Sequence, residues 1–328
     1  MGSALISYLI KNTHHSIFGL TRRKSQIDLT PIQNFIDNPR FKVIYGDISD
    51  DISINDIVKQ VQPDYFINYA GYTSVQPAWE SPVKVFDTNV LGVMRCLESI
   101  VKNKLNCRFL QSGSILQFEN AARPINEDSK PAPANIYGGS KNAAHDLIKI
   151  YREKYNLFAV NAILGNNESS QRGVNFLTNK VTKGIVNILK NYKEGKPISP
   201  IKLGNLDAIR SWGDTDDFVE ACWLMLNHGK PVDYLISTDE PATVRDFVEY
   251  ACFCAGLPLE WRGLGLNEFA FIPPFEKDKI IEVSVEFFRA EKDYLRADAS
   301  KIKKELSWSP KTDFRGLVKK LINSELNK

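Results

Sequence analysis

The chain has 328 residues, of which 43% are hydrophobic and 25% charged, and its net charge is +3. These values are typical of a globular protein with one large or two modest domains, and the charge is too mild to indicate nucleic acid or a membrane as a partner. The five cysteines match no common zinc motif, and the sequence contains neither a membrane-spanning apolar run nor a signal peptide. We therefore expect free thiols, no metal site and a cytoplasmic location.

In the first half of the chain, predicted helices and strands alternate. Apolar residues at helical spacing predict a helix over residues 3–12. Strands are predicted at 16–20, 41–45, 65–69, 107–112 and 158–164. Between them, helices are predicted through residues 57 and 61, at 83–103 and at 137–155. This alternation predicts an α/β fold with a Rossmann-like, doubly wound parallel sheet that is covered on both faces.

The second half is less regular. Helices are predicted at 175–191, 214–227, 243–255 and 299–306, with loops rich in Pro and Gly at 197–204 and 256–274. We expect a smaller mixed lobe that binds substrate. The predicted division is a cofactor-binding domain at 1–165 and a substrate lobe at 166–328, interleaved with the first.

The start of the chain lacks part of the expected pattern. A dinucleotide-binding sheet normally opens with a strand and a Gly-rich turn, followed by a helix whose N-terminus holds the pyrophosphate. Here the sequence opens directly on that helix, with Gly2 as the last glycine of the turn, so the first strand is expected to be absent. Its two neighbours would then keep unpaired backbone groups, each costing about 1 to 3 kcal/mol. Two interpretations stay open: a truncated start, or a chain that has lost cofactor binding or borrows a strand.

The segment Tyr137-Gly-Gly-Ser-Lys141, 23 residues beyond Ser114, carries the main chemical signal. A Tyr and a Lys four residues apart share one face of a helix, where the ammonium is expected to lower the pKa of the phenol toward neutral pH. Such a pair can move a proton while a hydride is transferred. Taken alone, the spacing also fits a solvated pair on a helix surface.

Several further segments, in the right order, strengthen this interpretation. They lie at 62–70, 87–92, 163–180, 203–213 and 288–289. With the Tyr-Lys pair, they make the chain resemble the extended short-chain dehydrogenase/reductase family and, within it, the GDP-mannose 4,6-dehydratases. This family converts GDP-mannose to GDP-4-keto-6-deoxymannose with a recycled NADP.

The resemblance implies a set of cofactor-binding residues. Arg22 and Arg23 follow the second strand of the fold, where positive charge suits the 2′-phosphate of NADP, although a surface arginine pair is the alternative. The resemblance adds Gly2, Asp47, Ile48, Asn68, Ala70 and Asn89 along the cofactor. In the family, the loop that carries Arg172 reaches the NADP of a neighbouring subunit, which implies a homo-oligomer, either a dimer or a tetramer.

The resemblance also implies a GDP-hexose substrate and a catalytic set. Asn166, Lys180, Arg210 and Arg289 fall on positions that hold the diphosphate, guanine and sugar. Ser114, Tyr137 and Lys141 fall on the catalytic positions, with Ser in place of the family's Thr.

The sequence departs from the family at the next catalytic position. Leu116 stands where the family has the Glu that removes the C5 proton, and a positioned acid/base is worth about 10² to 10⁴-fold in rate. Glu119 and Glu127 are possible replacements by sequence proximity alone. Smaller changes near the sugar are Ser74, Ala78, Ala134 and Asn167.

Three functions therefore remain in consideration. The leading one is a 4,6-dehydratase of the GDP-mannose type. The alternatives are an NADP-dependent GDP-sugar 4-reductase or epimerase, which needs no eliminating carboxylate, and a non-catalytic, degenerate paralogue.

Overall fold

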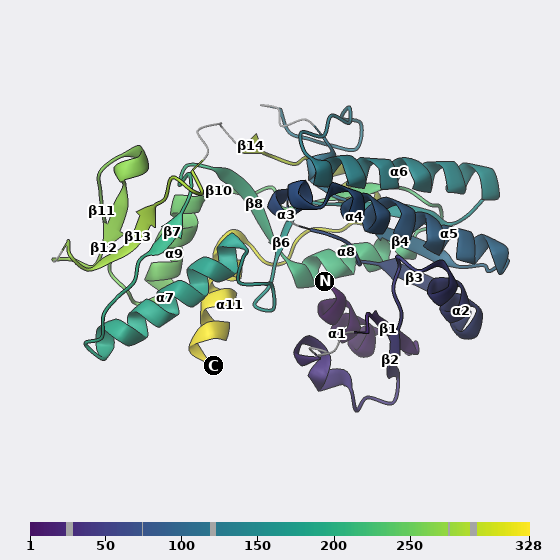
Figure 1. The fold of residues 1–328 in the computed structure, drawn as a ribbon, viewed down its shortest axis with the longest axis horizontal. Coiled ribbons are helices and arrows are strands. Elements are labelled where there is room, and N and C mark those ends of the chain that lie inside the picture. Colours follow the sequence, from purple (N-terminus) through teal and green to yellow (C-terminus); the bar gives the residue numbers. More distant parts are fainter. Residues whose placement is uncertain (24–28, 74, 119–122, 275, 289–293) are drawn as a thin grey trace.

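A computed structural model describes residues 1–23, 29–73, 75–118, 123–274, 276–288 and 294–328 (Figure 1). The molecule is elongated. One end is formed by a parallel sheet with helices on its faces, and the other by small strands packed with helices of the second half of the chain. Within the described residues, no helix is both long and apolar enough to span a bilayer.

The first half of the chain alternates helices and strands as predicted. Its helices are α1 (Gly2–Asn12), α2 (Asp51–Val61), α3 (Val75–Glu80), α4 (Pro82–Phe86), α5 (Gly92–Lys102) and α6 (Ile136–Tyr155). Its strands are β1 (Ile17–Thr21), β2 (Phe41–Tyr45), β3 (Tyr65–Asn68), β4 (Arg108–Ser112) and β5 (Ala159–Leu164). Short irregular helices are η1 (Thr30–Phe35), η2 (Asp87–Leu91, a π-helix) and η3 (Ile115–Gln117). The predicted helix over 83–103 is thus interrupted by the π-turn of η2.

The parallel sheet consists of two separate parts. One part has the strand order β3-β4-β5-β9, where β9 is Tyr234–Ile236, and the other is the pair β1-β2. Every pairing in both parts is parallel. Among the described residues, β1 pairs only with β2 and β3 only with β4, so the expected interruption at the first strand position is confirmed. Strand β9 belongs to the second half of the sequence, yet it extends the sheet of the first half.

Burial on both faces explains the composition of the central strands. All six residues of β5 and four of the five in β4 are buried, because helices cover the sheet on either side. On one face, α2, α5 and α6 pack around Phe109, and on the other, α8 (Thr215–Leu226) and α10 (Ser300–Leu306) pack around Leu110. Polar side chains mark where some of these helices begin. For example, the Asp50 carboxylate caps α2 by accepting the amides of Ile52 and Ser53.

The second half contributes the mixed lobe. Its helices are α7 (Leu177–Lys193), α9 (Val244–Ala255) and α11 (Phe314–Leu326). The strands form two small mixed sheets, β11-β12-β13-β7 and β10-β8-β14 with β6 paired to β8. These strands are β6 (Asn166–Glu168), β7 (Ile201–Leu203), β8 (Ile209–Asp214), β10 (Pro241–Thr243), β11 (Glu260–Arg262), β12 (Phe269–Phe271), β13 (Lys279–Val283) and β14 (Tyr294–Leu295); η4 spans Gly265–Asn267. Trp212, Phe247 and their neighbours form its separate apolar core.

Candidate active site

Ser114 lies just beyond the carboxyl end of β4, where ligands of open parallel sheets bind. Its backbone is extended, and its hydroxyl oxygen accepts the amide hydrogen of Leu116 at 3.2 Å, which caps the short turn η3. The Ser114 side chain also lies close enough to Tyr137 to lower the pKa of its phenol. Ser114 is buried, so this contact is protected from bulk water.

Tyr137 and Lys141 occupy the first turns of α6. Asn135 starts this helix because its side-chain oxygen accepts the Gly138 amide at 2.8 Å. The four-residue spacing points both side chains toward the end of β4, and the Lys141 ammonium donates to the Ser112 carbonyl at 2.7 Å. Its nitrogen lies 5.8 Å from the centroid of the Tyr137 ring. The structure therefore gathers Ser114, Tyr137 and Lys141 at one place.

The pKa of Tyr137 differs from our expectation. Burial raises it, and the hydrogen bond with Ser114 and the charge of Arg172 oppose that effect only in part. Burial also lowers the pKa of the Lys141 ammonium, to about 8. Lys141 therefore loses its charge at a lower pH than the one at which Tyr137 ionises, and it does not produce the predicted decrease in the pKa of the phenol. The prediction of an acidified phenol is thus wrong.

Asn89 connects three chain segments beside the Ser114, Tyr137 and Lys141 side chains. Its side-chain oxygen accepts the Tyr72 amide at 2.8 Å, and its side-chain nitrogen donates to the Ser140 hydroxyl at 2.9 Å and to the Tyr72 carbonyl at 3.2 Å. These contacts join the loop after β3, the π-turn η2 and the helix α6. The sequence did not predict the contact of Ser140 with Asn89, although Ser140 lies between Tyr137 and Lys141 and this position pointed to a place near the site.

Two other candidate cofactor residues are used for structural contacts. The Asn68 side chain donates to the side chain of Gln111 at 2.8 Å and accepts the Ala70 amide at 3.0 Å, so it joins β3 to β4. Ile48 is buried against Gly92 at the start of α5.

A cavity of about 460 Å³ lies beyond β1 and β2. Its lining residues are Arg22, Arg23, Tyr45, Gly46, Asp47, Asp50 and Ser53. The Arg23 guanidinium lies 5.6 Å from the centroid of the Tyr45 ring, and Asp47 accepts the Ser49 amide at 2.9 Å. Two cations, an aromatic ring and two carboxylates thus surround a space open to solvent. Gly2 begins α1, and no atom lies within 4 Å of the position of a Cβ there.

The Arg172 guanidinium is held within its own chain. It donates to the Asn167 carbonyl at 2.8 Å, is paired with the buried carboxylate of Glu168 and stacks over Phe176 at 3.8 Å from the ring centroid. Its charge still acts on Tyr137, where it opposes the increase in the pKa of the phenol.

The candidate substrate residues belong to the mixed lobe. The Lys180 ammonium lies 4.1 Å from the centroid of the Phe287 ring, and burial lowers its pKa. Arg210 donates to the Ile209 carbonyl at 2.8 Å, and Asn166 opens β6. Arg289 lies outside the described residues, as do Ser74 and Glu119.

Leu116 has apolar surroundings. It packs against a small cluster formed by Ala78, Val85 and Tyr137. Glu127 points elsewhere, because its carboxylate accepts the Leu235 amide of β9 at 2.7 Å. This contact ties Glu127 to β9, and its role as a replacement for the family's Glu stays a prediction.

Within the described part of the chain, no three His, Cys, Asp or Glu side chains are arranged to hold a metal ion. All five cysteines are free, and four of them are buried.

A Rossmann-like sheet that gathers a Ser, a Tyr and a Lys at the end of one strand defines an extended short-chain dehydrogenase/reductase. The sequence profile described as GDP-mannose 4,6 dehydratase matches residues 1–321, and the chain belongs to that family. It is 33% identical to the GDP-mannose 4,6 dehydratase of Drosophila melanogaster over 335 residues, which cover 99% of this chain and 83% of the relative.

Solved structures agree on the fold. The dTDP-glucose 4,6-dehydratase of Bacillus anthracis, in complex with NAD, has a TM-score of 0.78 at 19% identity and covers 98% of this chain and 92% of its own. The RMD protein of Pseudomonas aeruginosa, complexed with NADPH, has a TM-score of 0.74 at 19% identity. The match covers 95% of this chain and 99% of the RMD chain.

Proposed function

We propose that this protein is a GDP-hexose 4,6-dehydratase of the GDP-mannose type with NADP as a recycled cofactor. The observation that carries the proposal is the contact of Ser114 with Tyr137 beside Lys141, at the carboxyl end of β4. Family membership supports the nucleotide-sugar substrate, and GDP-mannose is the member of that class named by the relatives.

The residues around the sheet fit a nicotinamide dinucleotide. Arg22 and Arg23 supply positive charge to a cavity wide enough for a phosphorylated ribose, with Asp47 and Ile48 expected beside the adenine. The start of α1 at Gly2 offers unpaired amides to the pyrophosphate. When bound, NADP would accept a hydride from C4 of the hexose and return it to C6. The neighbours cited above bind NAD or NADPH, and the arginine pair favours NADP.

Within this site, Tyr137 would take the proton of the C4 hydroxyl. Tyr137 is a buried residue beside Ser114, and the Ser114 hydroxyl would hold the C4 oxygen of the sugar. Lys141, whose pKa is about 8, keeps most of its charge at pH 7 and would stabilise the phenolate as it forms. Asn68, Ala70 and Asn89 would border the ribose and pyrophosphate.

Cationic side chains of the mixed lobe would bind the GDP moiety. Lys180 and Arg210 provide charge for a diphosphate, and Asn166 provides an amide at the start of β6. Arg289 completes the proposed set. Arg172 would serve a neighbouring copy in a homo-oligomer once it leaves Glu168, as the family resemblance implies.

A second candidate function follows from Leu116. Elimination of water needs a group that removes the C5 proton, and the apolar contacts of Leu116 offer none. An NADP-dependent GDP-sugar 4-reductase or epimerase requires only the Ser, Tyr and Lys set, so this observation favours it as the alternative.

The experiment is to incubate the purified chain with GDP-mannose and NADP and to identify the product by mass spectrometry and NMR. A 4-keto-6-deoxy sugar supports the dehydratase. NADPH consumption with a supplied 4-keto sugar, and no loss of water, supports the reductase, whereas an epimerised GDP-hexose formed with no net NADPH consumption supports the epimerase. Tyr137→Phe serves as the control, since it should abolish either activity while GDP affinity stays within about twofold. Turnover that persists in this variant contradicts the assignment.

A further inference from the structure

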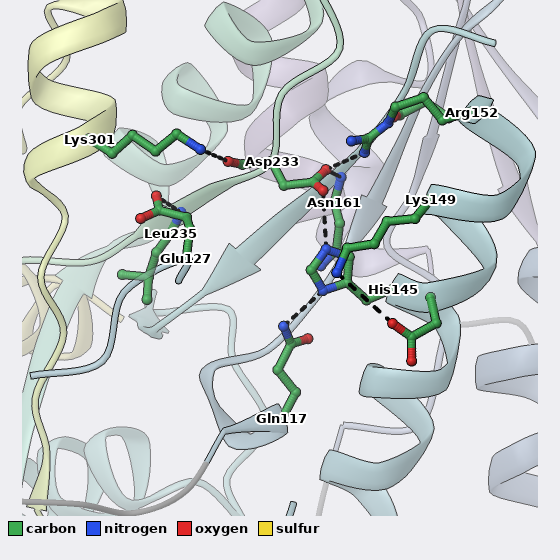
Figure 2. A network of polar contacts seen from close by, with 11 residues as sticks. Gln117, Glu127, His145, Lys149, Arg152, Asn161, Asp233, Leu235 and Lys301 are labelled. Atoms are coloured by element: carbon green, nitrogen blue, oxygen red, sulfur yellow. Dashed lines mark hydrogen bonds and ion pairs between the residues drawn. The ribbon is translucent and has the colours of Figure 1, made fainter. Parts of the chain in front are cut away.

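A buried polar chain runs from β9 to the turn that carries Ser114 (Figure 2). The Gln117 side-chain nitrogen lies 3.0 Å from His145 Nδ1, and His145 Nε2 lies 3.1 Å from Asp233 Oδ2. Gln117 and His145 are both buried. The Gln117 side-chain nitrogen and both ring nitrogens of His145 are paired, which offsets the cost of burying them, whereas the Gln117 side-chain oxygen has no hydrogen-bond partner among the described residues.

The ionised carboxylate of Asp233 sets the direction of these bonds. Burial by itself raises the pKa of Asp233, but His145, the Arg152 guanidinium and the Asn161 amide together bring it below its usual value. The Asp233 carboxylate accepts from Arg152 at 2.5 Å and from the Asn161 amide at 2.7 Å. A carboxylate only accepts, so Nε2 of His145 carries the proton, and Nδ1 is left to accept from Gln117.

Gln117 closes the same turn that Ser114 opens. The Gln117 amide donates to the Ser114 carbonyl at 3.2 Å, and the Gln117 carbonyl accepts the Ala132 amide at 3.2 Å. The turn therefore touches α6 twice: the Leu116 carbonyl packs against Gly138, and the Gln117 side chain reaches His145, two helical turns further along.

Tyr137, Lys141 and His145 recur every four residues on α6, so they share one helical face. A shift of His145 relative to the turn would change the distance between the Ser114 and Tyr137 hydroxyls. Because His145 is also bonded to Asp233 before β9, the sheet itself fixes this distance.

We propose that Gln117, His145 and Asp233 form a positioning relay that holds the Ser114 hydroxyl in place for Tyr137. None of the three is a catalytic residue, because each acts through the turn. The inference rests on the proposed function for its kinetic part only, since the rigidity of the turn can be measured without any activity.

The test is Gln117→Met, which keeps the length of the side chain and removes the donor to His145. The matched control is Tyr151→Phe on the same helix, which removes the hydrogen bond to Glu98 and leaves the turn untouched. Single-turnover hydride transfer is measured with the intact chain, NADP and saturating GDP-mannose. Amide hydrogen exchange over residues 113–118 is measured by mass spectrometry.

We expect Gln117→Met to slow hydride transfer by about tenfold or more, with GDP affinity within about twofold, because a small misplacement of a reacting group costs rate rather than binding. The amides of the turn should exchange faster than in the parent, and Tyr151→Phe should change neither quantity. If Gln117→Met does not fold, Gln117→Asn, whose amide is too short to reach Nδ1, should show the same two effects.

An unchanged rate and unchanged exchange in the variants would overturn the relay. If the parent itself transfers no hydride, the proposed function fails, and exchange over 113–118 alone decides on the relay. Faster exchange in Gln117→Met then supports it, and equal exchange overturns it.

Discussion

Gly138 of α6 lies against the backbone of Leu116: a Cβ on residue 138 would be 2.1 Å from the Leu116 carbonyl oxygen. Only a residue without a side chain permits this approach. Helix α6 and the turn that begins at Ser114 are therefore fixed to each other through a backbone contact.

Gly138→Ala should disrupt this contact. We expect a loss of about 1 to 3 kcal/mol in the free energy of unfolding, because the new methyl forces backbone to move, and slower hydride transfer. Gly139→Ala is the matched control, since nothing lies within 4 Å of its Cβ position, and it should be neutral or slightly stabilising. Denaturant unfolding of both variants checks this. Equal effects of the two substitutions would contradict it.

Leu116→Glu should accelerate elimination. We expect the 4-keto-6-deoxy product to form about 10²-fold faster than in the parent, because a carboxylate returns beside the sugar. The melting temperature should fall, since the new carboxylate enters an apolar cluster with Ala78 and Val85.

Leu116→Gln has nearly the same shape and no acid/base function, so it should stay at the parental rate. A rate for Leu116→Glu that equals that of Leu116→Gln, in protein that still folds, would show that the missing carboxylate is not the limit.

Lys141 makes stability depend on pH. Its pKa is lowered from 10.5 to about 8 by burial, so between these values the unfolded chain binds a proton that the folded chain lacks. Stability therefore rises with pH through this window, and below pH 8 the full penalty of burying the charge applies, at most about 3 kcal/mol.

Lys141→Met should accordingly stabilise the ligand-free protein at pH 7, and this gain should shrink as pH approaches 9.5. The free energy of unfolding of variant and parent, measured at both pH values, is the test. Lys149→Met, an exposed lysine on the same helix, is the control. A gain that stays constant with pH would be inconsistent with a buried ammonium at residue 141.

The double substitution Arg22→Ala and Arg23→Ala should weaken NADP binding about tenfold or more, since charge-assisted hydrogen bonds to a phosphate are lost. NAD lacks this phosphate, so its affinity should not change. Arg262→Ala, which removes an exposed arginine in the mixed lobe, controls for net charge. Equal affinities of the parent for NADP and NAD, measured by titration, would refute the role of the pair.

The sequence by itself determined the local elements of this protein. Strand β2 at Phe41–Tyr45 begins and ends where the pattern predicted, and α6 differs from its prediction by one residue, because periodicity and end signals are properties of neighbouring residues. The proximity of Tyr137 and Lys141 followed from helix geometry alone. The resemblance supplied the family, which the comparisons confirm.

Only the tertiary structure decided how distant residues meet. Strand β9 joins a sheet formed by the first half of the chain, and Asp233 reaches His145 across 88 positions. The direction of the Tyr137 pKa was predicted wrongly because it depends on burial, which a four-residue spacing does not reveal. Glu127 is close to Leu116 in sequence, but its bond to Leu235 turns it toward β9. Local order is encoded in spacing along the chain, whereas solvation and long-range contacts exist only once the chain has folded.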